Sequence, residues 1–225
     1  MLAAQRVAGV VAARVAGKIA SQIKADVTTY GGEYTDSISA EYWTQIYEAC
    51  YEYLTGDASI TATRNKGRKA VVNNFPPSFY SGYADGGGEE TENDDERWLT
   101  ARINTEQGFI DDLFSSLRDK RKEGMTKDEA DAEASTRAEG FRNTLNGIYS
   151  EGKLRGADNR MLTWALGETE EHCDTCETLD GQRHKARWWR EHGYKPREPG
   201  STTLDCRGYH CDCSLVDDKG DPFTI

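Results

Sequence analysis

Apolar residues recur at helical spacing along the N-terminal part of the chain. A first stripe within residues 1–25 consists of Val7, Val10, Val11, Val15 and Ile19, and Gly31-Gly32 follows it. A second stripe predicts a helix from about Ser39 to Leu54, and Gly56 marks its end. Residues spaced three and four apart share one face of an α-helix. We therefore predict two helices here, and we interpret Cys50, on the second stripe, as a small buried hydrophobic residue.

Two further stripes lie between residues 97 and 158. The first runs from Trp98 to Leu117, and the second runs from Ala134 to Tyr149. The sequence Thr126-Lys-Asp-Glu129 is typical of a capping box, in which each side chain bonds the other residue's backbone amide at a helix start. Because only a short connection around Gly124 separates the stripes, we predict an antiparallel helical hairpin over residues 97–158.

Proline and acidic residues divide the region before this hairpin. Pro76-Pro77 interrupts an apolar segment and is predicted to begin a short helix over residues 78–83. Residues 85–96 contain seven acidic residues and three glycines, a composition typical of a solvated linker. We therefore place a boundary there, after a helical N-terminal region (1–84).

The pattern changes after Gly152 and Gly156. Residues 161–166 are predicted to form a strand that ends at Gly167, and the chain beyond it is rich in Gly, Pro, Cys and Trp. We therefore predict a small cysteine-rich module over residues 159–225. The expected fold class is α+β and mostly α: a helical N-terminal region with a helical hairpin, followed by this module.

Composition and charge narrow the classes of function. Only 36% of residues are hydrophobic, 30% are charged and the mean hydropathy is −0.78, so the chain is expected to expose its helices or to bury surface inside an assembly. The net charge of −11 argues against a dedicated binder of duplex DNA. The sequence contains no run of about 18 apolar residues, so we predict no membrane span. We interpret the basic N-terminus as an exposed helix rather than a transit peptide, and expect a reducing compartment.

Five of the six cysteines and all four histidines lie between His172 and Cys213. Cys173-x-x-Cys176 has the spacing of a zinc knuckle, and Cys206-x4-Cys211-x-Cys213 offers the other half of a site. His172 and His210 are weaker candidates, because each adjoins a cysteine and is expected to point away. Our first choice of ligands is Cys173, Cys176, Cys206 and Cys211, with Cys213 as the alternative to Cys211. Four thiolates leave no open coordination position, so we predict a structural zinc ion that stabilises the module.

Other interpretations of the cysteines fit less well. A redox Cys-x-x-Cys pair is expected at a helix N-terminus in a βαβ unit, whereas this pair follows Glu-Glu-His in a segment predicted to be irregular. Disulfides would leave one of the five cysteines unpaired, and the motif of a zinc deaminase is not present. A zinc-dependent nuclease would need a histidine base beside a metal ligand, and no motif places His184 or His192 in that role.

A basic segment with two tryptophans lies between the two groups of cysteines. From Gly181 to Arg197 it has six Lys or Arg residues and one acid. The candidates for binding a partner or nucleic acid are Arg183, Lys185, Arg187, Trp188, Trp189 and Arg190. Such side chains can hold phosphates and stack on bases, but they can also form a surface helix whose tryptophans face inward. We favour packing, and we place a protein partner ahead of DNA because the chain is acidic.

One segment runs from Leu162 through Cys173-Asp-Thr-Cys176 to Leu179-Asp-Gly-Gln182, and it is followed by Trp188, Pro199-Gly200 and the closing Cys-x4-Cys-x-Cys. Together these residues resemble tailed-phage minor head proteins of the Mu F-like head morphogenesis family. Two upstream segments are also similar to these proteins: Phe79-Tyr-Ser-Gly-Tyr-x2-Gly-Gly-Gly and Asn146-Gly-Ile-Tyr-Ser-Glu-Gly-Lys-Leu-Arg-Gly. The resemblance covers roughly residues 75–225. The family more often closes its module with His-Pro-x-Cys-x-Cys, and Cys206 stands roughly at the place of that histidine.

The resemblance implies a virion component present in few copies. Such a protein acts near the portal in head assembly, and in DNA packaging or ejection. Such a protein would contact portal and major capsid or scaffold proteins, with packaged DNA as a further partner. The resemblance implies neither an enzymatic activity nor a small-molecule substrate. Its location would be the phage head, and the bacterial cytoplasm during assembly. A zinc-dependent nuclease and a DNA-binding accessory protein are the alternatives.

Overall fold

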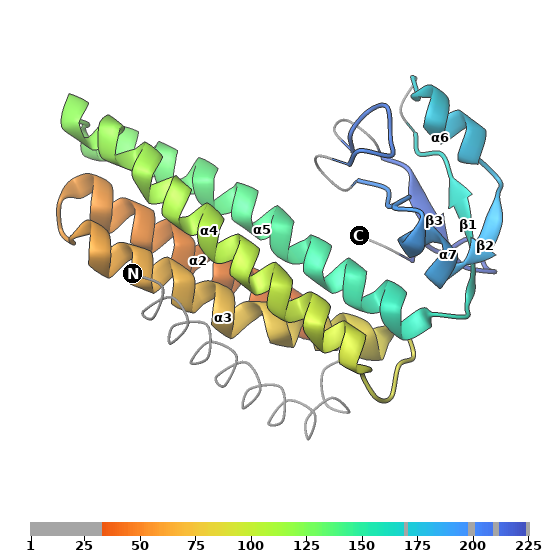
Figure 1. Cartoon of the computed structure of the whole chain (residues 1–225). Helices are drawn as coiled ribbons and strands as arrows, with labels where there is room; N and C mark the ends of the chain where they lie inside the picture. The colour runs from red at the N-terminus through yellow and green to blue at the C-terminus, as the bar shows by residue number, and fades with distance from the viewer. Residues whose placement is uncertain (1–32, 169–170, 198–200, 209–211, 224–225) are drawn as a thin grey trace.

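The computed structural model describes residues 33–168, 171–197, 201–208 and 212–223, with side chains from residue 37 onward. Within these residues the chain is mostly helical, with one small sheet, which confirms the coarse fold class (Figure 1). The long helices are α2 (Glu33–Thr55), α3 (Ile60–Asp85), α4 (Asn93–Glu123) and α5 (Lys127–Ala157). The helix expected within residues 1–25 lies outside the described residues.

Helix α2 carries the predicted apolar face. Ile46, Cys50 and Leu54 are buried, and the chain leaves the helix through Gly56, whose φ of +89° suits glycine. Burial raises the pKa of the Cys50 thiol to about 12. Cys50 is therefore a buried, protonated core residue, as its place on the stripe indicated.

The proline pair does not begin a helix, contrary to the sequence prediction. Helix α3 starts after its N-cap Ser59 and runs without a break through Pro76 and Pro77. A proline inside a helix removes a backbone hydrogen bond and crowds the preceding turn. Phe75 and Phe79 flank the pair and are fully buried, so packing against the other helices holds this segment helical.

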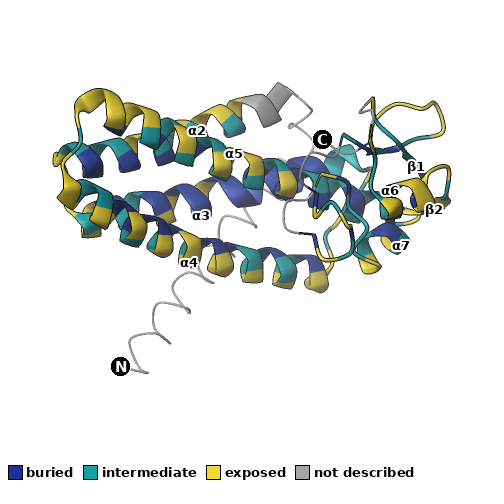
Figure 2. Cartoon of the chain, turned by 90° about the horizontal axis from the view of Figure 1, so that it is seen from above, coloured by how far each residue is buried: buried dark blue, intermediate teal, exposed yellow. Residues whose placement is uncertain are grey.

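The acidic segment is a short connection within one bundle rather than a boundary. The predicted linker covered residues 85–96, but α4 already begins at Asn93. Glu92 and Asp95 form a capping box there, and acidic residues in a first turn interact favourably with the helix dipole. Buried residues from both sides of the segment, such as Phe79 and Ile110, belong to the same core. Figure 2 shows the buried positions facing the interior of the bundle.

Helices α4 and α5 are consecutive and run antiparallel, since Lys120 near the end of α4 pairs with Glu133 near the start of α5, and Asp95 near the start of α4 pairs with Arg155 near the end of α5. The capping box of Thr126 and Glu129 begins α5 as predicted, and both helices pack mainly on α3 and α2. The closest packing joins α3 to α5 through glycines. A Cβ atom at Gly82 would lie 2.0 Å from the carbonyl oxygen of Tyr149, and one at Gly152 would lie 2.1 Å from that of Phe79.

The C-terminal module contains an antiparallel sheet of order β2-β1-β3. Its elements are β1 (Met161–Ala165), α6 (Asp174–Leu179), β2 (Arg183–Lys185), α7 (Ala186–Glu191) and β3 (Ser214–Val216). Leu162 and Trp164 of β1 are fully buried and pack in one core with Trp189 of α7. Because Leu154 and Ala157 of α5 belong to this core, the module is built onto the end of the bundle (Figure 1).

A largely buried ion network joins the module to the bundle. Arg155 of α5 lies 2.7 Å from Glu151 of the same helix and 2.7 Å from Asp95 of α4. Lys195, which follows α7, lies 2.8 Å from the other carboxylate oxygen of Glu151. Burial alone would raise the pKa of Glu151, but Lys195 and Arg155 outweigh burial and hold this pKa below its ordinary value. Among the described residues, no helix is long and apolar enough to cross a membrane.

Candidate metal centre

Three of the predicted ligands come together in the module. The Sγ atoms of Cys173, Cys176 and Cys206 all lie within 4.8 Å of one another, and the three cysteines are not in disulfides. In a tetrahedral zinc site with Zn–S bonds of about 2.3 Å, neighbouring sulfurs lie about 3.8 Å apart. The three thiols therefore need to move little to bind one metal ion. Cys211, our first choice for the fourth ligand, lies outside the described residues, and Cys213 lies in a different group, with His172 and Asp212.

The first two thiols are positioned by the start of a helix, in a segment that we predicted to be irregular. Cys173 is the N-cap of α6, and Cys176 is the third residue of that helix. Burial alone would raise the pKa of the Cys173 thiol, but hydrogen bonds from the backbone amides and side chains of Cys176 and Cys206 outweigh burial and lower it. This environment favours a thiolate, which is the form of cysteine that binds metals.

Cys206 is brought to α6 by the residue before it. The carboxylate of Asp205 accepts a hydrogen bond from the Thr175 amide at 3.1 Å and another from the Thr175 hydroxyl. Leu204 is buried in the core of the module. After Cys206 the chain turns sharply, because Arg207 has a φ of +52°. The contacts of Leu204 and Asp205 therefore hold the chain just before the Cys206 thiol.

The arrangement differs from that of a redox dithiol. A Cys-x-x-Cys pair at a helix N-terminus can be a redox site, so the position of Cys173 and Cys176 alone does not decide the matter. However, the sheet of the module is antiparallel, not the parallel sheet of a βαβ unit. A third thiol, that of Cys206, also lies within 4.8 Å of both. Three converging thiols favour metal binding, and the geometry alone leaves the identity of the metal open.

The tryptophans of the basic segment are engaged inside the module. Trp189 is fully buried, and its Nε1 donates a hydrogen bond to the carbonyl oxygen of Leu162 at 3.1 Å. Trp188 stacks on His184 and His192, with ring centroids 3.7 Å and 4.1 Å away. These contacts give both tryptophans and both histidines a role in packing.

The cations of the basic segment face acidic or polar residues of this chain. Arg183 pairs with Asp218 at 2.5 Å. Arg187 and Arg190 lie 3.8 Å and 3.6 Å from Asp158. The Nζ of Lys185 donates to the side chain of Asn159 at 3.0 Å. Because nearby acids compensate the arginines, the structure favours packing over phosphate binding for this segment.

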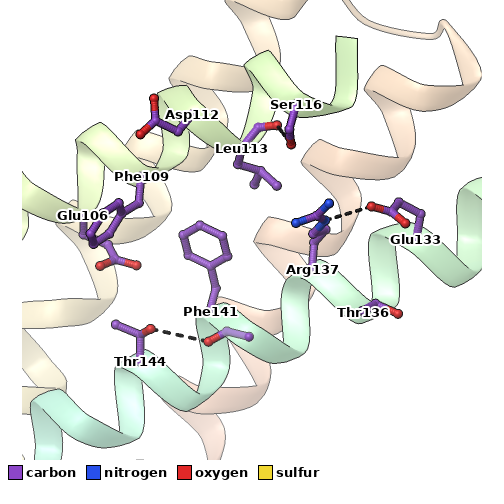
Figure 3. A pocket seen from close by; sticks show the side chains of 11 residues that line it. Glu106, Phe109, Asp112, Leu113, Ser116, Glu133, Thr136, Arg137, Phe141 and Thr144 are labelled. Carbon is purple, nitrogen blue, oxygen red and sulfur yellow. Dashed lines mark hydrogen bonds and ion pairs between the residues drawn. The ribbon is translucent and has the colours of Figure 1, made fainter. Parts of the chain in front are cut away.

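A groove between α4 and α5 was not predicted from the sequence. It encloses about 600 Å³, and Phe109 and Phe141 stand on its opposite walls (Figure 3). Phe109 is 50% exposed and is the one large hydrophobic residue that is exposed among the described residues. No local signal in the sequence marked this exposure, because the adjacent Leu113 and Phe114 of the same helix are both buried, whereas Phe109 beside the buried Ile110 is exposed.

A buried carboxyl group lies at one end of this groove. Only 2% of the Glu106 side chain is exposed, and its partner Arg102 lies 3.4 Å away. Burial raises the pKa of Glu106 to about 7, and Arg102 offsets only part of this effect. The hydroxyl of Tyr42, whose pKa burial and the nearby Glu106 raise, is buried and has no hydrogen-bond partner among the residues that the structure describes.

Comparisons of this chain with models of known protein families, with curated proteins and with solved structures give no match.

Proposed function

We propose that this protein is a minor structural protein of a tailed-phage head that acts in head assembly near the portal. The observation that carries the proposal is the structural role of the residues that resemble the Mu F-like family. In the Leu179-Asp-Gly-Gln182 segment, Gly181 has a φ of +71° and donates its amide to the Trp164 carbonyl oxygen at 3.0 Å. This segment thereby joins α6 to the sheet, beside the Cys-x-x-Cys pair.

The upstream segments that resemble the family also meet in space. Gly82 and Gly86 belong to one segment, and Gly152 and Gly156 belong to the other. A Cβ atom at any of the four would lie 2.0–2.3 Å from a backbone oxygen of the facing helix. The resemblance thus includes glycines at the close contact of α3 with α5, where a larger residue would clash with the facing backbone, and this supports a shared fold.

We propose that Cys173, Cys176 and Cys206, with Cys211 as the fourth ligand, hold a structural zinc ion. Four thiolates would close the coordination sphere. Metal binding supplies folding energy to small domains that lack a sufficient core. The ion would bind α6 to the loop that carries Cys206, and so would fix the module at the end of the bundle.

We place the contact with portal or capsid proteins at the α4–α5 groove. Phe109 and Phe141 offer an apolar surface, and the exposed Asp112 adds an acidic group beside it, whereas Glu133 is already paired with Lys120 and Arg137. Exposed apolar residues with polar rims are typical of interaction sites. A helix with apolar and basic residues from a head protein would suit this groove. The basic segment is a weaker candidate, because acids of this chain already pair its arginines.

The test is the location and copy number of the protein in purified phage heads. We expect a few copies in each head, measured by quantitative mass spectrometry, and a large loss of incorporation for Phe109→Ser. Asn104→Ser, at an exposed position of the same helix, is the matched control and should incorporate normally. Absence of the protein from heads would refute the proposed function. Equal incorporation of both variants would refute the placement of the contact at the groove.

A further inference from the structure

A second group of metal-ligating side chains lies in the module. A ring nitrogen of His172, a carboxylate oxygen of Asp212 and the Sγ of Cys213 all lie within 4.8 Å of one another. The group shares no residue with Cys173, Cys176 and Cys206. His172 and Cys173 are adjacent in the chain, yet their side chains belong to different groups.

The backbone holds this second group in place. The Asp212 carboxylate accepts a hydrogen bond from the Glu168 amide at 2.6 Å, and it occupies the space that a Cβ atom at Gly167 would need, 2.1 Å away. Arg197 donates from Nη2 to the carbonyl oxygen of Asp212 at 2.7 Å and from Nε to that of Cys213 at 3.2 Å. These contacts fix the two consecutive ligands relative to the end of β1.

The spacing of the group suits a divalent metal ion. In a tetrahedral zinc site, a nitrogen at about 2.0 Å and a sulfur at about 2.3 Å from the ion lie about 3.6 Å apart. The observed distance from Cys213 Sγ to His172 Nδ1 is 3.8 Å. A set of one nitrogen, one oxygen and one sulfur ligand is typical of zinc rather than of magnesium or calcium, which prefer oxygen alone.

We propose that His172, Asp212 and Cys213 form a second zinc site, separate from the cysteine site. Cys213 is fully buried, whereas His172 and Asp212 are half-buried. The mixed nitrogen, oxygen and sulfur ligands of this group distinguish it from the group of Cys173, Cys176 and Cys206, which consists of thiols.

The first experiment is zinc stoichiometry of the full chain, measured by elemental mass spectrometry after removal of excess metal. We expect two zinc ions in each chain. The double variant His172→Ala/Asp212→Asn should retain one ion, and Cys176→Ser should also retain one. Asp218→Asn changes an exposed acid of the same module and should retain two. A wild-type chain with one ion, or a double variant that retains two, would overturn the proposal.

The second experiment needs no variant, so it does not depend on the folding of one. Titration of the metal-free wild-type chain with Co²⁺ should reach an end point of two equivalents. We expect one phase with strong thiolate-to-cobalt absorption from several sulfurs, and another with the weaker absorption of a single sulfur. One phase that ends at one equivalent would overturn the second site. It would leave the proposed structural zinc at Cys173, Cys176 and Cys206 unaffected.

Discussion

Glu106→Gln should change how the stability of the protein depends on pH. The glutamine keeps the size and shape of the side chain but does not titrate. Because the folded-state pKa of Glu106, about 7, lies above the value of about 4.5 expected in an unfolded chain, the folded state binds the proton more tightly. This contribution to stability is fully present below about pH 4.5 and is lost as the pH rises through about 7.

The size of the effect follows from these two pKa values. One unit of difference corresponds to about 1.4 kcal/mol. As the pH rises from about 5 to about 8, the ionisation of Glu106 should therefore lower the unfolding free energy of the wild-type protein by about 2.5 kcal/mol. The glutamine variant should not show this decrease. The pKa of about 7 already includes the attraction of Arg102, which lies 3.4 Å from Glu106. The interaction of glutamine with Arg102 does not depend on pH in this range, so it shifts the variant's stability equally at both pH values and leaves the difference unchanged.

Urea denaturation of both proteins at the two pH values measures this difference. We expect the stability of Glu106→Gln, relative to wild type, to rise by up to about 2.5 kcal/mol between about pH 5 and about pH 8. Asp112→Asn is the control, because Asp112 is exposed on the same helix and lines the same groove, and we expect it to follow wild type. If Glu106→Gln also followed wild type at both pH values, Glu106 would be ionised in the folded protein and the reasoning from burial would be wrong.

Three other predictions concern glycine packing, the module core and the metal. Gly152→Ala should lower the unfolding free energy by about 1–3 kcal/mol because its methyl group meets a backbone oxygen. Gly147→Ala on the same helix, where no described residue lies within 4 Å of the added atom, should raise it by up to about 1 kcal/mol in urea titrations. Trp189→Ala should cost about 3–5 kcal/mol by the same measurement, and the half-buried Trp188 should cost less. Chelation of the metal should lower the thermal midpoint and weaken the near-UV circular dichroism of the module, while most of the far-UV helical signal persists; an unchanged midpoint would contradict a stabilising metal.

Helices α2, α4 and α5 were predictable because each carries an apolar stripe or a capping signal that acts within a few residues. The stripe of α2 and the capping box of Thr126 needed no knowledge of the rest of the fold. The continuation of α3 through Pro76 and Pro77 was not predictable in this way. It depends on the burial of Phe75 and Phe79 against helices that follow later in the chain, and a local preference cannot include that contribution.

The candidate site was predictable in part for a similar reason. The spacing of Cys173 and Cys176 places two thiols together through a single turn, and Cys206 joined them as expected. The choice between Cys211 and Cys213 depended on the direction of side chains in a loop held by Arg197 and by the end of β1. The groove between α4 and α5 required knowledge of which helices pack together, and the sequence pattern gives only which face of each helix is apolar.

The ion network around Glu151 connects the proposed metal to the helical bundle. Buried ion pairs add little net stability, because desolvation offsets their attraction, but removal of one partner leaves an uncompensated charge at a cost of about 3–5 kcal/mol. Glu151 belongs to the bundle, whereas Lys195 lies on the segment that leads from α7 toward Cys206. Anything that loosens this segment, including loss of the metal, would leave Glu151 buried with one cation fewer. We therefore predict that the proposed metal, through the pairing of Lys195 with Glu151, also stabilises helices that it does not touch.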